Sequence, residues 1–140
     1  MNVYFSHPAK TEFDGTAKIL LKVLQRNFPT ITFINPFNSP LTHQYLNNLG
    51  DEKTAKKIVE KDLIHIRESQ LMVAYQPYIS RGTTMEIFYA RTQCYIPVII
   101  YKCPDHQHPW LLGLNCKIVQ SLDKLIKEIG KVVENEKSKI

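Results

Sequence analysis

The sequence lacks the features that mark several classes of protein. Its 140 residues include only three cysteines and no CxxC pair, which argues against both a disulfide framework and a zinc cluster. No stretch comes near the ~20 consecutive apolar residues of a membrane-spanning helix. The first residues have neither the basic lead nor the apolar run of a signal peptide. We therefore expect a cytoplasmic protein that does not contact a membrane.

Nucleotide-binding fingerprints and a strong charge bias are also missing. Neither GxGxxG nor GxxxxGK[ST] occurs in the chain. The 18 Lys and Arg against 13 Asp and Glu give a net charge of +5, yet the basic residues alternate with acidic ones. Mixed charge of this kind is typical of solvated helix surfaces. We therefore do not expect long nucleic acid as a partner.

What the chain does contain is an alternation of short apolar runs and longer helical patterns. The spacing predicts strands at residues 3–5, 31–34, 71–75, 97–101 and 117–119, and helices at residues 13–27, 52–68, 84–93 and 122–133. Continuously apolar strands between helices favour a parallel sheet covered on both faces. The prediction is an α/β, single-domain, Rossmann-like (flavodoxin-like) three-layer fold with a mostly parallel sheet of about five strands. We place this domain at residues 1–134 and a frayed tail at residues 135–140.

The carboxyl ends of the predicted strands indicate where a ligand would bind. In open parallel sheets, ligands lie in the crevice outside these ends. Four segments would line that crevice, at residues 6–8, 35–45, 76–82 and 102–110. The stretch from Phe37 to Gly50 follows Pro36, contains Pro40 and has no clean period, which predicts a long functional or mobile loop.

Asp62 has an unusual place on the predicted helix 52–68. It lies four residues from Ile58 and Ile66 and three from Val59, so it shares their apolar face and points toward the sheet. Burial of an unpaired carboxylate is costly. Asp62 is therefore either a structural residue bonded to loop amides or a residue placed at a cleft.

Glu86 follows the turn at residues 80–84 and lies in the first turn of the next predicted helix. One interpretation is a capping box, Thr83-Thr84-Met85-Glu86, in which Glu86 reaches back to the cap backbone. The other is a cleft residue, because Gly82 beside it would let a ligand approach the backbone closely. Glu86 and Asp62 would then face one pocket. Two carboxylates in different environments are what glycosidic chemistry uses.

Three stretches carry a resemblance to a known family: DLIHIRESQLMVAY at 62–75, SRGTTMEIFYA at 80–90 and IPV at 96–98. They resemble the nucleoside 2-deoxyribosyltransferase family, which includes the 2′-deoxynucleoside 5′-phosphate N-hydrolases. The shared pattern is a helical Asp-Leu, an apolar strand, a turn with Gly, a Glu that opens a helix ending in Tyr-Ala, and a strand. The start VYFSHP is similar to the family's first strand and turn, and the resemblance covers most of residues 3–129.

This resemblance implies roles for three side chains. Glu86 matches the catalytic glutamate that attacks the anomeric carbon of the sugar. Asp62 matches the aspartate that contacts the nucleoside and helps to protonate the leaving base. Tyr4 matches a tyrosine whose hydroxyl sits against the glutamate, the alternative being a plain strand tyrosine. Such a mechanism requires no metal or redox cofactor, and we expect none.

The resemblance also bears on the substrate. The transferases place an aspartate at the position of Ser80, where it binds the sugar 5′-hydroxyl, whereas the N-hydrolases place a serine that binds a 5′-phosphate. Ser80 and the backbone amides around Gly82, at a helix N-terminus, therefore favour a 5′-monophosphate. Arg81 is a candidate charged donor, unless it is merely exposed to solvent. Ser6 is a candidate second hydroxyl contact, and His7 is either a phosphate contact or an ordinary turn histidine.

Together these features predict N-glycosidic bond cleavage in a (deoxy)nucleoside 5′-monophosphate or (deoxy)nucleoside, through Glu86, with release or exchange of the base. Hydrolysis is favoured, and base exchange by a nucleoside 2-deoxyribosyltransferase is the alternative. A non-catalytic nucleotide-binding or sensing module is the alternative of another class. The resemblance further implies a homodimer or larger homo-oligomer, with a small-molecule nucleoside or nucleotide as partner.

The remaining chemically rich segment contains Cys103, His106 and His108. A zinc site is one interpretation, but no second ligand pair accompanies these residues, and structural zinc sites use four ligands. A cleft or interface loop is favoured, in which Trp110 packs on a base or a neighbouring subunit. Phe37, Tyr45 and Tyr78 are candidates to sandwich a base, the alternative being ordinary core or surface aromatics.

Overall fold

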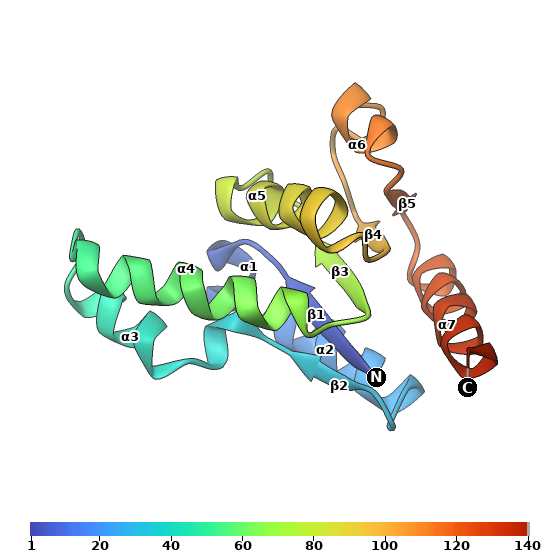
Figure 1. Cartoon of the computed structure of the whole chain (residues 1–140), viewed down its shortest axis with the longest axis horizontal. Helices are drawn as coiled ribbons and strands as arrows, with labels where there is room; N and C mark the ends of the chain where they lie inside the picture. The colour runs from blue at the N-terminus through green and yellow to red at the C-terminus, as the bar shows by residue number, and fades with distance from the viewer. Residues whose placement is uncertain (140) are drawn as a thin grey trace.

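The predicted apolar runs pair into one parallel sheet in the computed structural model, which describes residues 1–139 (Figure 1). The five strands are β1 (Asn2–Ser6), β2 (Thr32–Ile34), β3 (Leu71–Tyr75), β4 (Val98–Tyr101) and β5 (Lys117–Val119). Their order in the sheet is β2-β1-β3-β4-β5, and every neighbouring pair is parallel. The α/β fold class and the five-stranded parallel sheet are thus confirmed.

The strand order creates a switch point between β1 and β3. From β1 the chain moves outward to β2, and from β3 it moves outward in the other direction to β4 and β5. The register places Ser6 beside Ala74 at the carboxyl ends of the two strands. Because the connections diverge here, a crevice for ligands is expected at this edge of the sheet.

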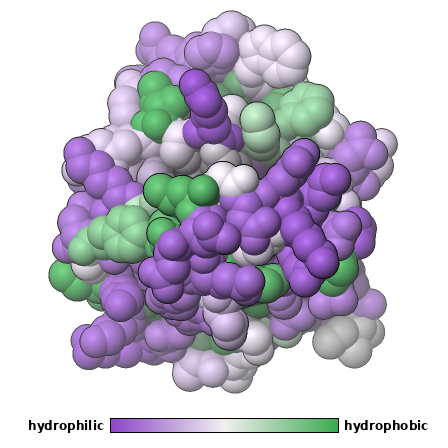
Figure 2. All heavy atoms as spheres, turned by 90° about the vertical axis from the view of Figure 1, so that its left-hand side faces the viewer, coloured by the Kyte–Doolittle hydropathy of each residue, from purple (hydrophilic) through white to green (hydrophobic). Residues whose placement is uncertain are grey.

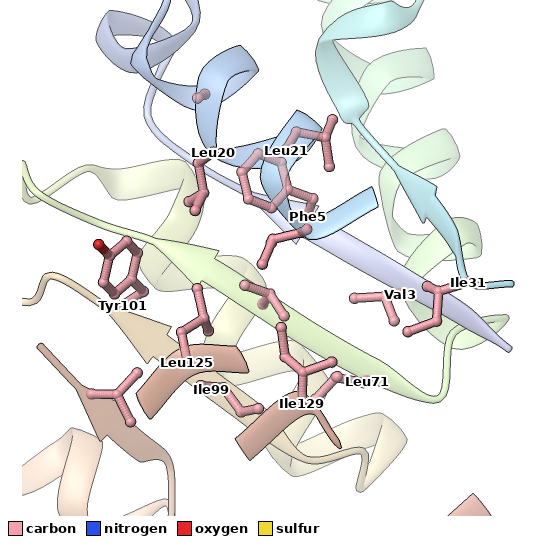
Figure 3. Packing of buried hydrophobic residues seen from close by; sticks show 14 residues of the cluster. Val3, Phe5, Leu20, Leu21, Ile31, Leu71, Ile99, Tyr101, Leu125 and Ile129 are labelled. Carbon is pink, nitrogen blue, oxygen red and sulfur yellow. The ribbon is translucent and has the colours of Figure 1, made fainter. Parts of the chain in front are cut away.

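One face of the sheet is covered by α2 (Thr16–Asn27) and α7 (Leu122–Ser138). Val3 and Phe5 of β1 point to this face, together with Leu71 of β3 and Ile99 of β4 (Figure 3). Both helices pack side chains at helical spacing against this same face of the sheet: Ala17, Leu20, Leu21, Leu24, Leu125 and Ile129. This face is the larger apolar core.

The opposite face is covered by α4 (Glu52–Arg67), α5 (Arg81–Tyr89) and the π-helical turn η2 (Ala90–Cys94). Its apolar part includes Met72 and Ile100 from the strands and Ile66 and Ile87 from the helices. Tyr4 belongs to the same layer. Strand side chains alternate between faces, so Tyr4 and Ser6 lie opposite Val3 and Phe5.

The prediction of a long loop from Phe37 to Gly50 is wrong. The chain forms the 3₁₀ turn η1 (Pro36–Asn38) and the helix α3 (Pro40–Asn47). Each begins with a proline, which a helix tolerates at its first position. The side chains of Asn35 and Ser39 cap these starts by accepting hydrogen bonds from backbone amides at 3.0 and 3.2 Å. Here the prolines start helices instead of breaking them.

Two helix boundaries near the site also differ from the prediction. The expected helix at residues 13–27 begins at Thr16 as α2, because Gly15 adopts a positive φ of 83° just before it, and a separate short helix, α1 (Ala9–Phe13), precedes this turn. The helix that carries Glu86 begins at Arg81 instead of residue 84, because the Ser80 side chain caps it by accepting from the Thr83 amide at 3.3 Å.

The C-terminal part of the chain is more regular than expected. A short helix, α6 (Pro109–Gly113), lies within the predicted loop 102–113. Helix α7 continues through Ser138, past the proposed domain end at residue 134, so residues 135–138 are helical where a frayed tail was expected. Ion pairs between Lys137 and Glu134 and between Lys139 and Glu136 support this last part. Residue 140 lies outside the described residues.

The surface seen from the left side of Figure 1 is mixed in character. Apolar side chains appear there as small patches among hydrophilic ones (Figure 2). Within residues 1–139, no helix is long and apolar enough to cross a membrane.

Candidate functional site

A cavity of about 490 Å³ lies at the carboxyl ends of β1 and β3. Its lining residues come from the segments that follow both strands, from the η1 and α3 segment, and from α4 and α5. The lining residues are His7, Pro8, Ala9, Pro36, Phe37, Thr42, Ile58, Val59, Asp62, Leu63, Ser80, Gly82, Thr83, Met85 and Glu86. Most of these side chains are apolar, and Asp62 and Glu86 are the two carboxylates among them.

Three of the four segments expected at the crevice contribute to this cavity, and the segment 102–110 does not. It follows β4, which is one strand further from the switch point, and it leads into α6. Residues of α5 and α6 enclose a second cavity of about 280 Å³, to which Asp105 and His108 belong. The tertiary arrangement therefore separates the His-rich segment from the carboxylates.

Glu86 is held by two hydroxyl groups from one strand. The Tyr4 hydroxyl donates to Oε2 of Glu86, and Ser6 Oγ donates to Oε1 at 2.7 Å. Both donors reach the same carboxylate because they are two residues apart on β1 and share a face. The capping-box interpretation is thereby corrected, since Ser80 caps the helix and Glu86 is directed to β1.

The surroundings of Glu86 balance opposing influences on its charge. Burial favours the neutral acid and, with the negative charge of Asp62, raises the pKa of Glu86 to about 7. The hydrogen bonds from Tyr4 and Ser6 and the positive charge of Lys61 act in the lowering direction. Near neutral pH the carboxyl is therefore part ionised and part protonated.

Tyr4 remains a hydrogen-bond donor over the whole physiological pH range. Burial, followed by the negative charges of Glu86 and Asp62, raises the pKa of its phenol far above the ordinary value. A phenol that does not ionise keeps its proton on the bond to Glu86. This geometry is the one that the resemblance implied for Tyr4.

Asp62 approaches the cavity from α4. Its Oδ1 atom lies 3.1 Å from Nζ of Lys61, which also donates to the backbone oxygen of Pro36 at 3.2 Å. Burial raises the pKa of Asp62, while the contact with Lys61 opposes that rise. The side chain thus lines the cavity as a partly buried carboxyl beside a cation. The alternative of a structural Asp bonded to loop amides does not describe this arrangement.

The structure places Ser6 and His7, the two residues that follow one another at the end of β1, differently with respect to the cavity. Ser6 is fully buried, bonded to Glu86 and absent from the cavity lining, which corrects its assignment as a direct phosphate contact. His7 lines the cavity, but Nε2 lies 3.1 Å from Glu12 and Nδ1 lies 3.4 Å from the Phe5 oxygen. Burial lowers the pKa of His7. Its ring packs against Phe37 in a tilted arrangement, with centroids 4.8 Å apart and an angle of 44° between the ring planes, so it forms part of an aromatic wall.

The N-terminus of α5 forms another part of the lining. Ser80 Oγ accepts from the Thr83 amide, which leaves its own hydroxyl proton free to donate. A Cβ added at Gly82 would meet nothing within 4 Å, so the space beside this backbone is open. Arg81 is exposed and outside the lining, in agreement with the alternative of a solvent-exposed arginine. This helix end therefore offers neutral donors to an anion.

Of the other aromatic candidates, one lines each cavity and two line neither. Phe37 lines the larger one, whereas Tyr45 and Tyr78 do not, and the ammonium of Lys10 lies 4.2 Å from the Tyr78 ring centroid. Trp110 lines the smaller cavity and lies 6.2 Å from Phe88, measured between ring centroids. Only Phe37 among the predicted base-stacking residues faces the carboxylates.

The Cys and His segment does not assemble a metal site within the described part of the chain. Cys103 is buried and its Sγ lies 3.1 Å from Oδ1 of Asp105, whereas His106 and His108 are exposed. Across residues 1–139, no group of three or more His, Cys, Asp or Glu side chains is placed to hold a metal ion.

One interaction of the site and one of its residues were not predicted from the sequence. The bond between Ser6 and Glu86 had a signal, because the period of two along β1 puts Ser6 on the face of Tyr4. Lys61 had none, since successive helix positions point in directions about 100° apart. Its place beside Asp62 is stabilised by the Pro36 oxygen, which only the tertiary structure brings near.

Comparison with known proteins bears on the fold. No protein-family model matches the chain, and no curated protein does. Among solved structures, it is similar to a conserved protein from Enterococcus faecalis V583, with a TM-score of 0.69 and 21% identity over 94% of this chain and 98% of that one. It is also similar to a 2-deoxyribosyltransferase from Bacillus psychrosaccharolyticus, with a TM-score of 0.62 and 15% identity over 90% of each chain. At these identities the likeness shows a shared fold.

Proposed function

We propose that this protein is an enzyme that cleaves the N-glycosidic bond of a (deoxy)nucleoside 5′-monophosphate or (deoxy)nucleoside, with Glu86 as nucleophile. The observation that carries the proposal is that the Glu86 carboxylate accepts hydrogen bonds from Tyr4 and Ser6 and lines a largely apolar cavity, which Asp62 also lines. A cavity of about 490 Å³ is within the range that small-molecule sites occupy. The fold shared with a 2-deoxyribosyltransferase supports the same conclusion.

The reaction follows from where charge develops. As the bond between the sugar carbon and the base nitrogen breaks, the bonding electron pair moves to the base and positive charge builds on the sugar. An ionised Glu86 stabilises the sugar and forms a glycosyl ester with it. Asp62 supplies a proton to the base, directly or through a water molecule. Water then attacks the ester, Asp62 accepts a proton from it, and Glu86 is restored.

The protonation states suit this division of roles. Burial raises the pKa of both carboxyls, and that of Glu86 to about 7, so protonated and ionised forms of Glu86 coexist near neutral pH. The positive sugar favours the anion at Glu86, which lies against the two donors. The proton is then better placed on Asp62, where the leaving base needs it.

The proposed substrate carries a 5′-phosphate, and the proposed reaction is hydrolysis. The start of α5 supports this choice, because Ser80 and the open backbone at Gly82 offer neutral donors where an acidic side chain would repel a dianion. Base exchange between deoxynucleosides is the second candidate. It is favoured by the structural likeness to the 2-deoxyribosyltransferase and differs only in what attacks the glycosyl ester.

We also propose that the protein works as a homodimer or larger homo-oligomer in the cytoplasm. The exposed apolar side chains of Ile79, Phe88 and Trp110 around the smaller cavity support self-association through that side. Sedimentation velocity tests the assembly directly, and a monomer at micromolar concentration would contradict it.

The activity is tested with a panel of nucleosides and 5′-monophosphates, followed by chromatography for the free base. We expect free base from the wild type and a loss of about 10³-fold or more in Glu86→Gln, which removes the nucleophile. Asp62→Asn should lose about 10²–10⁴-fold, the usual contribution of a general acid.

Glu60→Gln provides the control, because it removes an exposed carboxyl from α4. Its turnover should equal that of the wild type. Base appearing only when a second base is supplied would select the transferase. Tight binding of a nucleotide without turnover in the wild type would contradict the proposed enzymatic activity and favour a binding module.

A further inference from the structure

Ser6 takes part in the site without lining the cavity. It ends the central strand β1, is fully buried, and sits beside Ala74 of β3 in the sheet. Its hydroxyl donates to Oε1 of Glu86 at 2.7 Å, while the Tyr4 hydroxyl donates to Oε2. The two carboxylate oxygens therefore have one donor each, and both donors belong to one rigid strand.

Together, the two hydrogen bonds fix the orientation of the Glu86 carboxylate more completely than either bond does alone. A single donor leaves a carboxylate free to rotate about the bond to its side chain, whereas two donors on different oxygens define its plane. Each oxygen has two lone pairs, so one on each remains available after the two bonds are made. Glu86 can thus be held by the strand and still present an oxygen to the cavity.

We infer that Ser6 is a positioning residue, whose hydroxyl orients the Glu86 carboxylate and favours its ionised form for attack on the sugar. The inference rests on the proposed function in assigning that attack to Glu86. It gives Ser6 a role through Glu86, in place of the phosphate contact expected from the sequence.

The charged and titratable groups around Glu86 define what the loss of Ser6 would do. Tyr4 faces it from β1, while Asp62 and Lys61 face it from α4, and His7 lines the same cavity from the segment after β1. Burial and Asp62 raise the pKa of Glu86, and the bonds from Tyr4 and Ser6 and the charge of Lys61 lower it. Removal of one lowering contribution should therefore raise the pKa above about 7.

The test compares Ser6→Ala with the wild type in two measurements. The first is the titration of the Glu86 carboxyl by ¹³C NMR, with the signal identified by its absence in Glu86→Gln. We expect the midpoint to rise by about one pH unit, because the ionised carboxylate loses one of its two hydrogen-bond donors while Tyr4 retains the other. The second is the pH profile of kcat: the loss relative to the wild type should be about tenfold larger at pH 6 than well above pH 8, where only the lost orientation of the carboxylate still acts, with little change in KM.

Ser69→Ala is the matched control, because Ser69 is also buried and also donates a 2.7 Å bond, but to the backbone oxygen of His65. It should move neither readout. Ser6→Cys keeps the size of the side chain with a weaker donor, should give intermediate values, and carries the test if Ser6→Ala does not fold.

The outcomes separate the two proposals. An unchanged Glu86 titration in both Ser6 variants overturns the positioning role, whatever the activity. An equal loss of kcat at every pH also overturns it, because a merely structural defect would act that way. A shifted titration in a protein whose wild type releases no base supports the contact between Ser6 and Glu86 but overturns the proposed reaction.

Discussion

The two faces of the sheet are made by the same strands and have different chemistry. On β1, Val3 and Phe5 enter an apolar layer under α2 and α7 (Figure 3). Tyr4 and Ser6, on the other face, enter a layer that contains a carboxylate. All four side chains are fully buried. Burial by itself therefore does not distinguish the core from the site.

The difference lies in how each face satisfies its side chains. The first face contains apolar groups, which gain roughly 25 cal/mol for each Å² removed from water and need no particular partner. The second contains hydroxyls and carboxyls, whose burial is tolerated only when each finds a partner. Polar burial is therefore concentrated at the carboxyl edge, where α5 brings Glu86 to the two hydroxyls of β1. The first face should govern stability and the second activity.

The largest effect on this comparison should come from Leu24→Ala in the apolar layer. Leu24 is fully buried between α2 and the sheet, so its truncation should cost about 2–5 kcal/mol of unfolding free energy. Urea denaturation measures that loss, and kcat per folded molecule should stay at the wild-type value. Lys22→Ala, at an exposed position of the same helix, should change stability by no more than about 0.5 kcal/mol. A proportionate fall in kcat for Leu24→Ala would show that the faces are not separable.

A second prediction concerns the free energy of unfolding that the protein loses by burying Glu86 on the site face as the pH rises. The folded protein raises the pKa of Glu86 from 4.5 to about 7, so it binds this proton more tightly than the unfolded chain does. The free energy of unfolding should therefore fall as pH rises through this window, and Glu86→Gln should abolish that fall. Relative to the wild type, the variant should gain up to about 3 kcal/mol between pH 4 and pH 8.

Urea denaturation at a series of pH values measures this difference. Glu60→Gln again serves as the control, because its carboxyl is exposed in the folded protein. Parallel stability curves for the wild type and Glu86→Gln would contradict the buried-carboxyl account of the site. A variant that is more stable yet inactive would sharpen the contrast between the two faces.

The smallest expected effect is on the choice of substrate at the start of α5. Ser80→Asp keeps a good N-cap, so the helix should remain stable. It also adds a negative charge beside Gly82, which should lower kcat/KM for 5′-monophosphates by about 10- to 100-fold, equivalent to about 1.4–2.8 kcal/mol. Nucleoside turnover should change much less.

Ser121→Asp is the matched control, since Ser121 caps α7 with the same 3.3 Å bond that Ser80 makes in α5. Steady-state kinetics on paired substrates gives the answer. Equal losses on nucleoside and monophosphate would refute the phosphate assignment of Ser80.

Much of the fold could be predicted because its signals are local. Strand β3 has the predicted bounds, and α4 begins at the predicted Glu52, since apolar runs and helical periods are properties of neighbouring residues. The prediction failed where the same residue types allow two outcomes. Pro36 and Pro40 suggested a loop, but Asn35 and Ser39 cap the starts of helices there.

The candidate site was predictable in part. Helical spacing placed Asp62 on the face of α4 that carries Ile58 and Ile66, and the position of Glu86 after β3 placed it at the crevice, where both carboxylates line one cavity. The roles of these residues in a reaction stay predictions. The direction of the Ser6 hydroxyl and the separation of the 102–110 segment depend on which elements pack together, which spacing does not specify.

By itself, the sequence determined which side chains share a face, because the two-residue period of a strand and the 3.6-residue period of a helix are set by the backbone. Only the tertiary structure decided which faces meet. Tyr4 and Ser6 bond a carboxylate 82 and 80 residues away, and that contact depends on the strand order β2-β1-β3-β4-β5 and on how α5 lies against β1 and β3. Such long-range pairing arises from the packing of the whole domain, so no local pattern contains it.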